Sequence, residues 1–134
     1  KIEANVADAD DAVMLDLDGF IAETNATNIF VIRNGVLLTP DATACLPGLT
    51  RSFVIDLAAE MNIPLKERQL SLTELYTADE AFTTGTMGGL SHGVEVDGRK
   101  IGNAPTMGKM THLLNQAYQQ RIWDAGVSLP FCSN

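Results

Sequence analysis

The chain has 134 residues, of which 46% are hydrophobic and 19% are charged, a composition typical of one folded domain with a sizeable core. Its net charge of -8 includes only nine Lys and Arg residues, so we expect no nucleic-acid partner, because phosphate contacts need clustered cations. No apolar run approaches the roughly 20 residues that a membrane span needs, so we expect no membrane partner either.

The two cysteines, Cys45 and Cys132, form no disulfide framework and do not have the spacing of zinc ligands. We therefore expect no metal site and a reducing, cytoplasmic location. An organelle such as a mitochondrion or plastid would apply if a transit peptide had been removed. The first residue is Lys1 rather than Met, so we expect the chain to be a piece of a longer protein.

The first half of the chain predicts paired strands. Residues 1–4 look like the end of a helix, and an acidic loop leads from them to an apolar strand over residues 12–17. Asp18-Gly19 then predicts a two-residue type I′ turn, which requires positive φ at both positions. Asn34-Gly35 and Asp97-Gly98 predict two more hairpins, so we expect a largely antiparallel sheet. The other expected strands are 20–21, 29–33, 36–38, 80–84, 94–96 and 99–101, with 63–70 as an edge strand.

Helices are predicted between these strands. Apolar residues recur at helical spacing over residues 51–61, with Thr50 as the expected N-cap. Ser71 and Glu74 have the capping-box spacing of a short helix that ends near residue 78. The last long helix is expected from about Thr106 to Trp123. Strands and helices in this order predict a mixed α/β domain without strict βαβ alternation.

Residues 22–30 are the first candidate site. Glu23 is a single carboxylate that lies just before a run of small polar residues and between two apolar strands. This arrangement lets a ligand approach the backbone closely, and it suits a planar, hydrogen-bonding ligand better than a packed core.

Two further stretches suit an anion. Residues 46–51 end a loop at a helix start, where free N–H groups and the helix dipole favour a phosphate or carboxylate, and where Thr50 adds a hydroxyl donor. Residues 84–89 follow a strand and are small, so consecutive N–H groups can converge on an anion. Taken alone, each stretch is also explained by an ordinary N-cap or a glycine-rich turn. Together with Glu23 they predict a phosphorylated heterocycle with a basic ring nitrogen, a description that pyridoxal 5'-phosphate fits.

These stretches resemble the class IV aminotransferases, the fold-type IV enzymes that include branched-chain and D-amino-acid transaminases. The resemblance rests on three ordered motifs, at 14–30, 45–51 and 78–88, and covers roughly residues 1–120. It implies the larger C-terminal domain of that family, with residues 1–134 forming a single cofactor-binding domain. It further implies pyridoxal phosphate as cofactor and a homodimer. The implied reaction is transamination between an aliphatic, branched-chain amino acid and a 2-oxo acid.

The resemblance also assigns roles to residues of this chain. Glu23 would pair with the pyridinium nitrogen of the cofactor. The backbone N–H groups of Met87 and Gly88, next to Thr86, would bind the carboxylate of the substrate. Asn28 is expected to shape its turn rather than touch the cofactor. The cofactor-binding residues implied in this way are Glu23, Leu46, Gly48, Leu49, Thr50 and Thr86, with Leu49, Thr50 and Thr86 around the phosphate.

The chain departs from the family pattern at the catalytic lysine. In the family, the lysine that forms the Schiff base lies well upstream of the motif glutamate, which places it before Lys1. Lys66, Lys100 and Lys109 do not occupy that motif position either. We therefore expect no catalytic residue and no small N-terminal domain in this chain, which alone should be inactive. Residues 91–93 and 102–108 also differ from the family's turn before the last helix.

Two alternatives remain open. The strand that leads into Asp16-Leu17-Asp18-Gly19 resembles the first motif of haloacid-dehalogenase-type phosphatases, in which Asp16 would be the nucleophile, Asp18 the general acid and magnesium the counter-ion. A hairpin turn explains Asp18-Gly19 without any chemistry. The other alternative is a non-catalytic packing module, which predicts a large exposed apolar patch where a small domain and a second subunit would dock.

Overall fold

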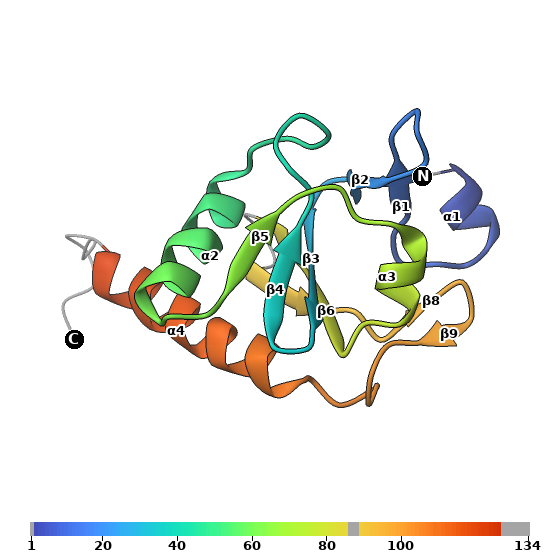
Figure 1. Ribbon diagram of the computed structural model, residues 1–134. Coiled ribbons are helices and arrows are strands. Elements are labelled where there is room, and N and C mark those ends of the chain that lie inside the picture. Colours follow the sequence, from blue (N-terminus) through green and yellow to red (C-terminus); the bar gives the residue numbers. More distant parts are fainter. Residues whose placement is uncertain (1, 86–88, 127–134) are drawn as a thin grey trace, which may run out of the picture.

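The computed structural model describes residues 2–85 and 89–126, and it has the mixed α/β architecture that the sequence predicts (Figure 1). In chain order the elements are α1 (Ile2–Val6), β1 (Val13–Leu15), β2 (Ile21–Thr24), β3 (Asn28–Arg33), β4 (Val36–Thr39), α2 (Leu49–Glu60), β5 (Leu65–Glu67), α3 (Leu72–Tyr76), β6 (Glu80–Gly85), β7 (Gly89–His92), β8 (Glu95–Val96), β9 (Arg99–Lys100) and α4 (Lys109–Ala125).

The main sheet has the strand order β5-β4-β3-β6-β7, with β3 at its centre. Strand β3 is antiparallel to both of its neighbours, and β6 is antiparallel to β7. Strand β5 is parallel to β4, because the chain crosses between them through helix α2. The sheet is therefore largely antiparallel, as expected, with one parallel pair at its edge.

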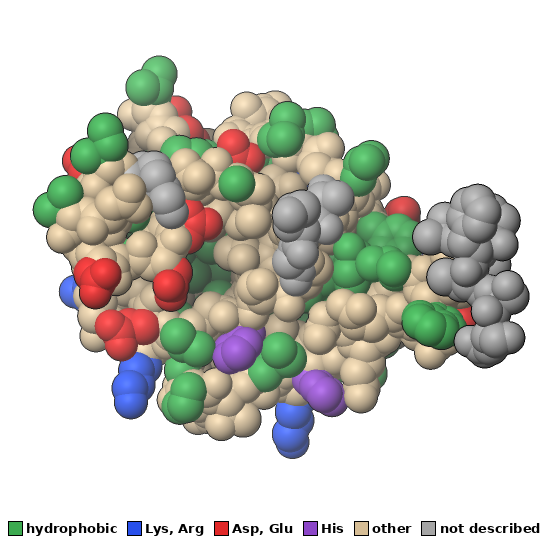
Figure 2. Space-filling view, turned by 180° about the vertical axis from the view of Figure 1, so that it is seen from behind, with side chains coloured by type: hydrophobic (Ala, Val, Ile, Leu, Met, Phe, Trp, Pro, Cys, Tyr) green, Lys and Arg blue, Asp and Glu red, His purple; other side chains and the backbone are tan. Residues whose placement is uncertain are grey.

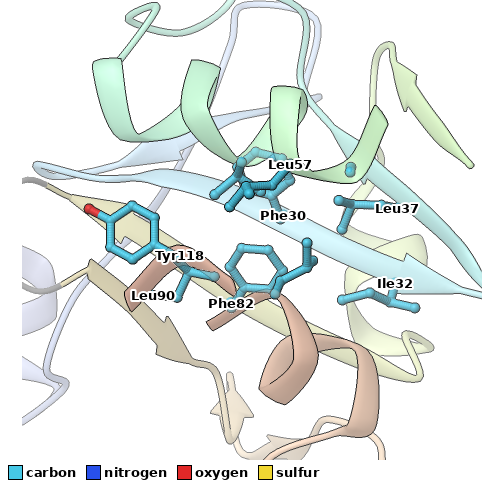
Figure 3. Packing of buried hydrophobic residues seen from close by; sticks show 10 residues of the cluster. Phe30, Ile32, Leu37, Leu57, Phe82, Leu90 and Tyr118 are labelled. Atoms are coloured by element: carbon cyan, nitrogen blue, oxygen red, sulfur yellow. The ribbon is translucent and has the colours of Figure 1, made fainter. Parts of the chain in front are cut away.

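Both faces of the sheet are covered, so the central strand is buried along almost its whole length. Phe30 and Phe82 stack on the face under α2 and α4, with ring centroids 5.0 Å apart (Figure 3). Ile29 and Val31 point to the other face, where they pack with residues of β2 and α3. This alternation follows from the two-residue period of a strand, and it explains why residues 29–32 of β3 form an unbroken apolar run.

Two of the three predicted hairpin turns are confirmed. Asn34 and Gly35 have φ values of 49° and 75°, and Asp97 and Gly98 have values of 50° and 73°. The prediction was wrong at Asp18-Gly19, where only the glycine has positive φ. Strand β1 ends at Leu15 and β2 begins at Ile21, so the connection is longer than two residues. The carboxylate of Asp16 stabilises it by accepting hydrogen bonds from the N–H groups of Asp18 (3.0 Å) and Phe20 (2.9 Å).

The helices begin at different residues from those expected. Helix α2 starts at Leu49, and its N-cap is Gly48, so the prediction of Thr50 as N-cap was wrong. Helix α4 starts at Lys109 with Gly108 as N-cap, three residues after the expected start. The predicted capping box is confirmed, because the Ser71 side chain accepts from the N–H of Glu74, whose carboxylate accepts from the N–H of Ser71. The predicted edge strand is limited to Leu65–Glu67.

Candidate functional site

The structure brings Glu23 next to the loop that precedes helix α2. Glu23 lies on β2, and its Oε2 atom accepts a hydrogen bond of 3.0 Å from the backbone N–H of Leu46. Its other oxygen, Oε1, makes no hydrogen bond to the described residues. A half-buried carboxylate with one oxygen held and one available can accept a hydrogen bond from a ligand.

A tight turn after Glu23 brings the end of β6 to the same place. The turn is closed by a 2.9 Å bond from the N–H of Thr24 to the carbonyl of Thr27, and the two hydroxyl oxygens are 2.5 Å apart. A Cβ atom added to Gly85, the last residue of β6, would lie 2.9 Å from the Thr27 methyl carbon. Only glycine permits this approach, so β6 ends directly beside the turn that follows Glu23.

The N-terminus of α2 is open to an anion. Its first intrahelical bond runs from the N–H of Ser52 to the carbonyl of Gly48, so the N–H groups of Leu49, Thr50 and Arg51 have no acceptor within the helix. Gly48 supplies no side-chain cap. The Leu49 side chain is 87% exposed, whereas Thr50 is 8% exposed. Free N–H groups and the positive end of the dipole are the elements of an anion site.

Arg51 anchors this helix end to the rest of the domain. It is 5% exposed, and its guanidinium donates to the carbonyl of Pro40 (2.8 Å) and to the carboxylate of Glu67 on β5 (2.7 Å). Arg51 therefore ties α2 to the preceding loop and to the sheet edge. The motif at residues 45–51 contains Arg51. No local pattern, however, indicated that its side chain would be buried or that it would contact Pro40 and Glu67.

Cys45 lies in the same loop and is buried. Its thiol donates weakly to the carbonyls of Asp41 (3.5 Å) and Pro40 (3.8 Å). Burial raises the pKa of the Cys45 thiol, while the nearby Arg51 guanidinium acts in the opposite sense. A buried thiol with a raised pKa packs as a small apolar side chain and is a poor nucleophile.

Five of the residues assigned from the resemblance thus meet in one place: Glu23, Leu46, Gly48, Leu49 and Thr50. The other three, Thr86, Met87 and Gly88, lie outside the described residues. The resemblance implied that Asn28 shapes the turn rather than touching the cofactor. In the structure, its amide donates a 2.7 Å hydrogen bond to the carbonyl of Leu46, in the loop before α2.

Asp16, the nucleophile of the alternative phosphatase interpretation, has another role in the described structure. The Asp16 carboxylate is engaged with backbone N–H groups of its own turn, which stabilises the connection between β1 and β2. Within residues 2–85 and 89–126, no group of three or more His, Cys, Asp or Glu side chains is placed to hold a metal ion. Over the same residues, no helix has both the length and the apolar character to cross a membrane.

Comparison with known proteins decides the family. The family model for amino-transferase class IV matches residues 1–95. The chain belongs to the class IV aminotransferases. This agrees with the resemblance carried by the three motifs.

Individual class IV relatives share much of this sequence and fold. The chain is 51% identical over 130 residues to the branched-chain-amino-acid aminotransferase-like protein 1 of Arabidopsis thaliana, which covers 97% of the chain and 23% of that protein. It is 48% identical over 116 residues to the branched-chain-amino-acid aminotransferase of Pseudomonas aeruginosa, covering 87% of the chain and 38% of the relative. The chain therefore spans well under half the length of these relatives.

The fold agrees as well. The structure of the T.th. branched-chain amino acid aminotransferase in complex with N-(5'-phosphopyridoxyl)-L-glutamate matches with a TM-score of 0.88 and 32% sequence identity. The match covers 94% of this chain and 42% of that one. The architecture described above is therefore that of a part of the class IV aminotransferase fold.

Proposed function

We propose that this chain is the cofactor-binding domain of a pyridoxal phosphate-dependent aminotransferase. The whole protein would transfer an amino group between an aliphatic, branched-chain amino acid and a 2-oxo acid. The observation that carries the proposal is the hydrogen bond from Leu46 to Glu23, which sets a carboxylate beside the uncapped N-terminus of α2. Relatives named as branched-chain aminotransferases support the substrate class.

Glu23 suits the ring nitrogen of the cofactor. The N–H of Leu46 occupies Oε2, and Oε1 remains to accept a hydrogen bond from the protonated pyridine nitrogen. When bound, pyridoxal phosphate supplies an electron sink, which depends on that ring nitrogen keeping its proton. Glu23 would hold this proton in place.

The N-terminus of α2 suits the phosphate. The N–H groups of Leu49 and Thr50 have no acceptor within the helix, and the Thr50 hydroxyl is a further donor. Thr86 would complete the phosphate site from the segment that follows Gly85. Helix α4 offers a contrast, because the Glu80 carboxylate already accepts from the N–H groups of Met110 and Thr111 in its first turn and would repel a phosphate.

The substrate would lie over the same segment. Backbone N–H groups at Met87 and Gly88 would bind the carboxylate that amino acids and 2-oxo acids share, with Thr86 beside them. The lysine that carries the reaction would come from the part of the protein before Lys1. A cytoplasmic location stays a prediction.

We also propose a homodimer for the whole protein. Several apolar side chains near the start of the chain are exposed, including Ile2 at 82%, Val6 at 84% and Leu17 at 106%. Hydrophobic side chains also reach the surface on the face seen in Figure 2. Exposed apolar side chains are commonly buried at subunit interfaces, so their presence supports the proposed dimer. Sedimentation equilibrium of the whole protein would test it, and a monomer at micromolar concentration would contradict it.

A cofactor titration tests the proposed function. Adding pyridoxal phosphate to the purified protein should give a saturable absorbance change. Glu23→Gln should weaken binding about 10- to 100-fold, because a hydrogen bond to a charged group contributes roughly 1.5–3 kcal/mol. Glu95→Gln, an exposed acid on β8, serves as the matched control.

Three results would contradict the proposal. Absence of any saturable absorbance change in the unsubstituted protein would show that it has no cofactor site. Equal affinity of Glu23→Gln and the unsubstituted protein for pyridoxal phosphate would show that this carboxylate does not bind the cofactor. Magnesium-dependent phosphatase activity that Asp16→Asn abolishes would favour the phosphatase instead. In the whole protein, amino-group transfer from L-leucine to a 2-oxo acid measures the substrate class directly.

A further inference from the structure

Asn28 is a buried residue whose side-chain amide contacts the loop before α2 through both its nitrogen and its oxygen atom. It is the first residue of β3 and is 5% exposed. Its Nδ2 atom donates a 2.7 Å hydrogen bond to the carbonyl of Leu46. Its Oδ1 atom lies in the space that a Cβ atom on Gly48 would occupy. Asn28 thus touches the residue that binds Glu23 and the N-cap of α2.

We propose that Asn28 is a positioning residue that sets the spacing between the Glu23 carboxylate and the N-terminus of α2. This inference rests on the proposed function, in which these two groups bind opposite ends of one rigid cofactor. Asn28 itself would make no contact with the cofactor.

The first step of the argument is that Leu46 is held on both sides. Its N–H donates to Glu23, and its carbonyl accepts from Asn28 and from the N–H of Gly48, the latter at 2.8 Å. The peptide groups before and after Leu46 are therefore both bonded. Releasing the Asn28 bond would leave the Leu46 carbonyl bonded only to Gly48, within the same loop, and would let the loop move relative to β3 and Glu23.

Gly48 provides the second step. Its φ of -64° and ψ of 145° are open to any residue, so the backbone conformation does not require glycine there. What requires glycine is the close approach of the Asn28 side chain, since an added Cβ would collide with Oδ1. The glycine at the N-cap of α2 and the amide on β3 are thus a complementary pair.

The third step concerns what holds Asn28 itself. Strand β3 is the centre of the main sheet, and Asn28 pairs with Thr84 of β6, directly before Gly85. Residues that position a site act best from rigid elements. Asn28 can therefore fix the position of the loop at Leu46 and of the N-terminus of α2 relative to the sheet.

The consequence is a specific defect. A ligand that bridges two subsites gains affinity only when the spacing of the subsites matches its own length. Loss of Asn28 leaves Glu23 and the N–H groups of α2 chemically intact but lets their separation vary. Affinity for pyridoxal phosphate should fall, whereas inorganic phosphate, or pyridoxal without its phosphate, should bind as before.

The test compares these three ligands in Asn28→Ala and Asn28→Asp. Asn28→Asp keeps the shape but replaces the donor that faces the Leu46 carbonyl with an oxygen. Each variant should weaken pyridoxal phosphate about 10-fold or more, on the scale of one buried hydrogen bond. The dissociation constants of pyridoxal and of inorganic phosphate should change less than about twofold. Both are measured by titrating the NMR signals of the backbone N–H groups. Asn115→Ala on α4 is the control and should behave as the unsubstituted protein.

A double-mutant cycle tests the contact with Gly48. Gly48→Ala alone should weaken pyridoxal phosphate, because the new Cβ displaces the Asn28 side chain. In the Asn28→Ala background the same substitution meets no amide, so its effect should be much smaller. Additive effects of the two substitutions would contradict the proposed coupling.

Hydrogen exchange of the Leu46 N–H, measured without any ligand, separates this inference from the proposed function. Exchange should be faster in both Asn28 variants than in the unsubstituted and Asn115→Ala proteins. If the unsubstituted protein does not bind pyridoxal phosphate while this exchange still rises, the proposed function fails and the positioning role stands. Equal affinity for pyridoxal phosphate and equal Leu46 exchange in all proteins would overturn the inference. Equal weakening of all three ligands would overturn it too, since a general loss of structure would then explain the data.

Discussion

Glu80 on β6 caps helix α4 through Thr111. Its Oε2 atom accepts hydrogen bonds from the backbone N–H of Thr111 at 2.8 Å and from its hydroxyl at 2.6 Å, and its Oε1 atom accepts from the N–H of Met110 at 3.0 Å. The carboxylate thus does for α4 what a bound anion would do for α2. The two long helices have similar first turns, and one of them carries its anion within the chain.

Removing the charge of this cap should destabilise the fold. Glu80→Gln keeps one acceptor but loses the interaction of a negative charge with the helix N-terminus, so we expect a loss of about 1–2 kcal/mol in the free energy of unfolding. Urea unfolding of the purified protein measures it, with Glu95→Gln as a surface control. An unchanged unfolding midpoint would show that the Glu80 contacts contribute nothing net.

The glycine before α4 should be as sensitive as the glycine before α2. A Cβ atom on Gly108 would collide with the carboxyl group of Glu80, although the backbone there, with φ of -68° and ψ of 159°, admits any residue. Gly108→Ala should therefore lower the free energy of unfolding by about 1–3 kcal/mol, the usual range for overpacking. In a Glu80→Ala background the loss should shrink. An equal loss in both backgrounds would place the strain elsewhere.

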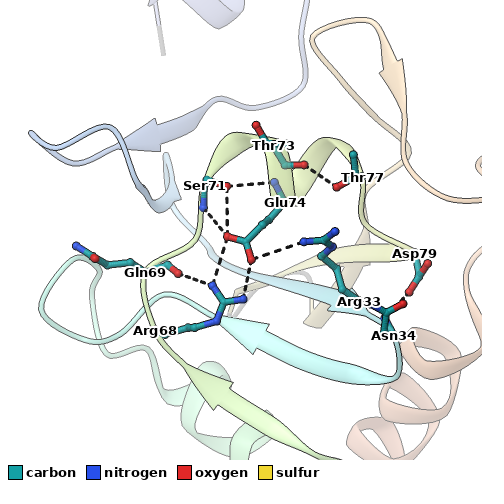
Figure 4. A network of polar contacts seen from close by, with 9 residues as sticks. All are labelled: Arg33, Asn34, Arg68, Gln69, Ser71, Thr73, Glu74, Thr77 and Asp79. Carbon is teal, nitrogen blue, oxygen red and sulfur yellow. Dashed lines mark hydrogen bonds and ion pairs between the residues drawn. The ribbon is translucent and has the colours of Figure 1, made fainter.

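Glu74 should make stability depend on pH in the acid range. Its carboxylate binds Arg68 at 2.6 Å, accepts from the Ser71 N–H, and lies 3.7 Å from Arg33 (Figure 4). The Arg68 guanidinium holds the pKa of Glu74 at about 2, below its ordinary value of 4.5.

Because the folded pKa of Glu74 is lowered, the unfolded chain binds its proton first, and stability falls as pH drops from 4.5 toward about 2. The pH dependence should be weaker in Glu74→Gln, by about 1–2 kcal/mol over this range, a value reduced for the exposure of Arg68. Urea unfolding between pH 2 and pH 6 measures the difference. Parallel curves for the two proteins would contradict the prediction.

Cys45 should resist alkylation in the folded protein. Burial lowers the access of a reagent, and it raises the pKa of the thiol, which reduces the reactive thiolate. In a Cys132→Ser background, iodoacetamide at pH 8 should react at least about 100-fold more slowly with the folded than with the urea-unfolded chain. Mass spectrometry follows the reaction. Labelling of the native protein at the unfolded rate would contradict the burial.

Local patterns predicted those parts of the fold that depend on neighbouring residues. The Asn34-Gly35 turn and the Ser71–Glu74 capping box are complete within two and four residues, so the sequence determined both. The same reasoning failed at Asp18-Gly19, where the carboxylate of Asp16 replaced the tight turn. It failed again at Thr50, because helix α2 begins at Leu49 with Gly48 as its N-cap.

The sequence by itself determined which residues belong to the candidate site, because Glu23 and residues 46–50 stand in motifs that resemble one family. Only the tertiary structure decided how they are held. The Asn28–Leu46 and Glu80–Thr111 contacts join residues 18 and 31 positions apart. Such contacts arise from the pairing of β3 with β6 and the packing of α2 and α4 on that sheet, and no local periodicity encodes them. The Glu80 contact closes the N-terminus of α4 with a carboxylate, whereas the N-terminus of α2 has no side-chain cap.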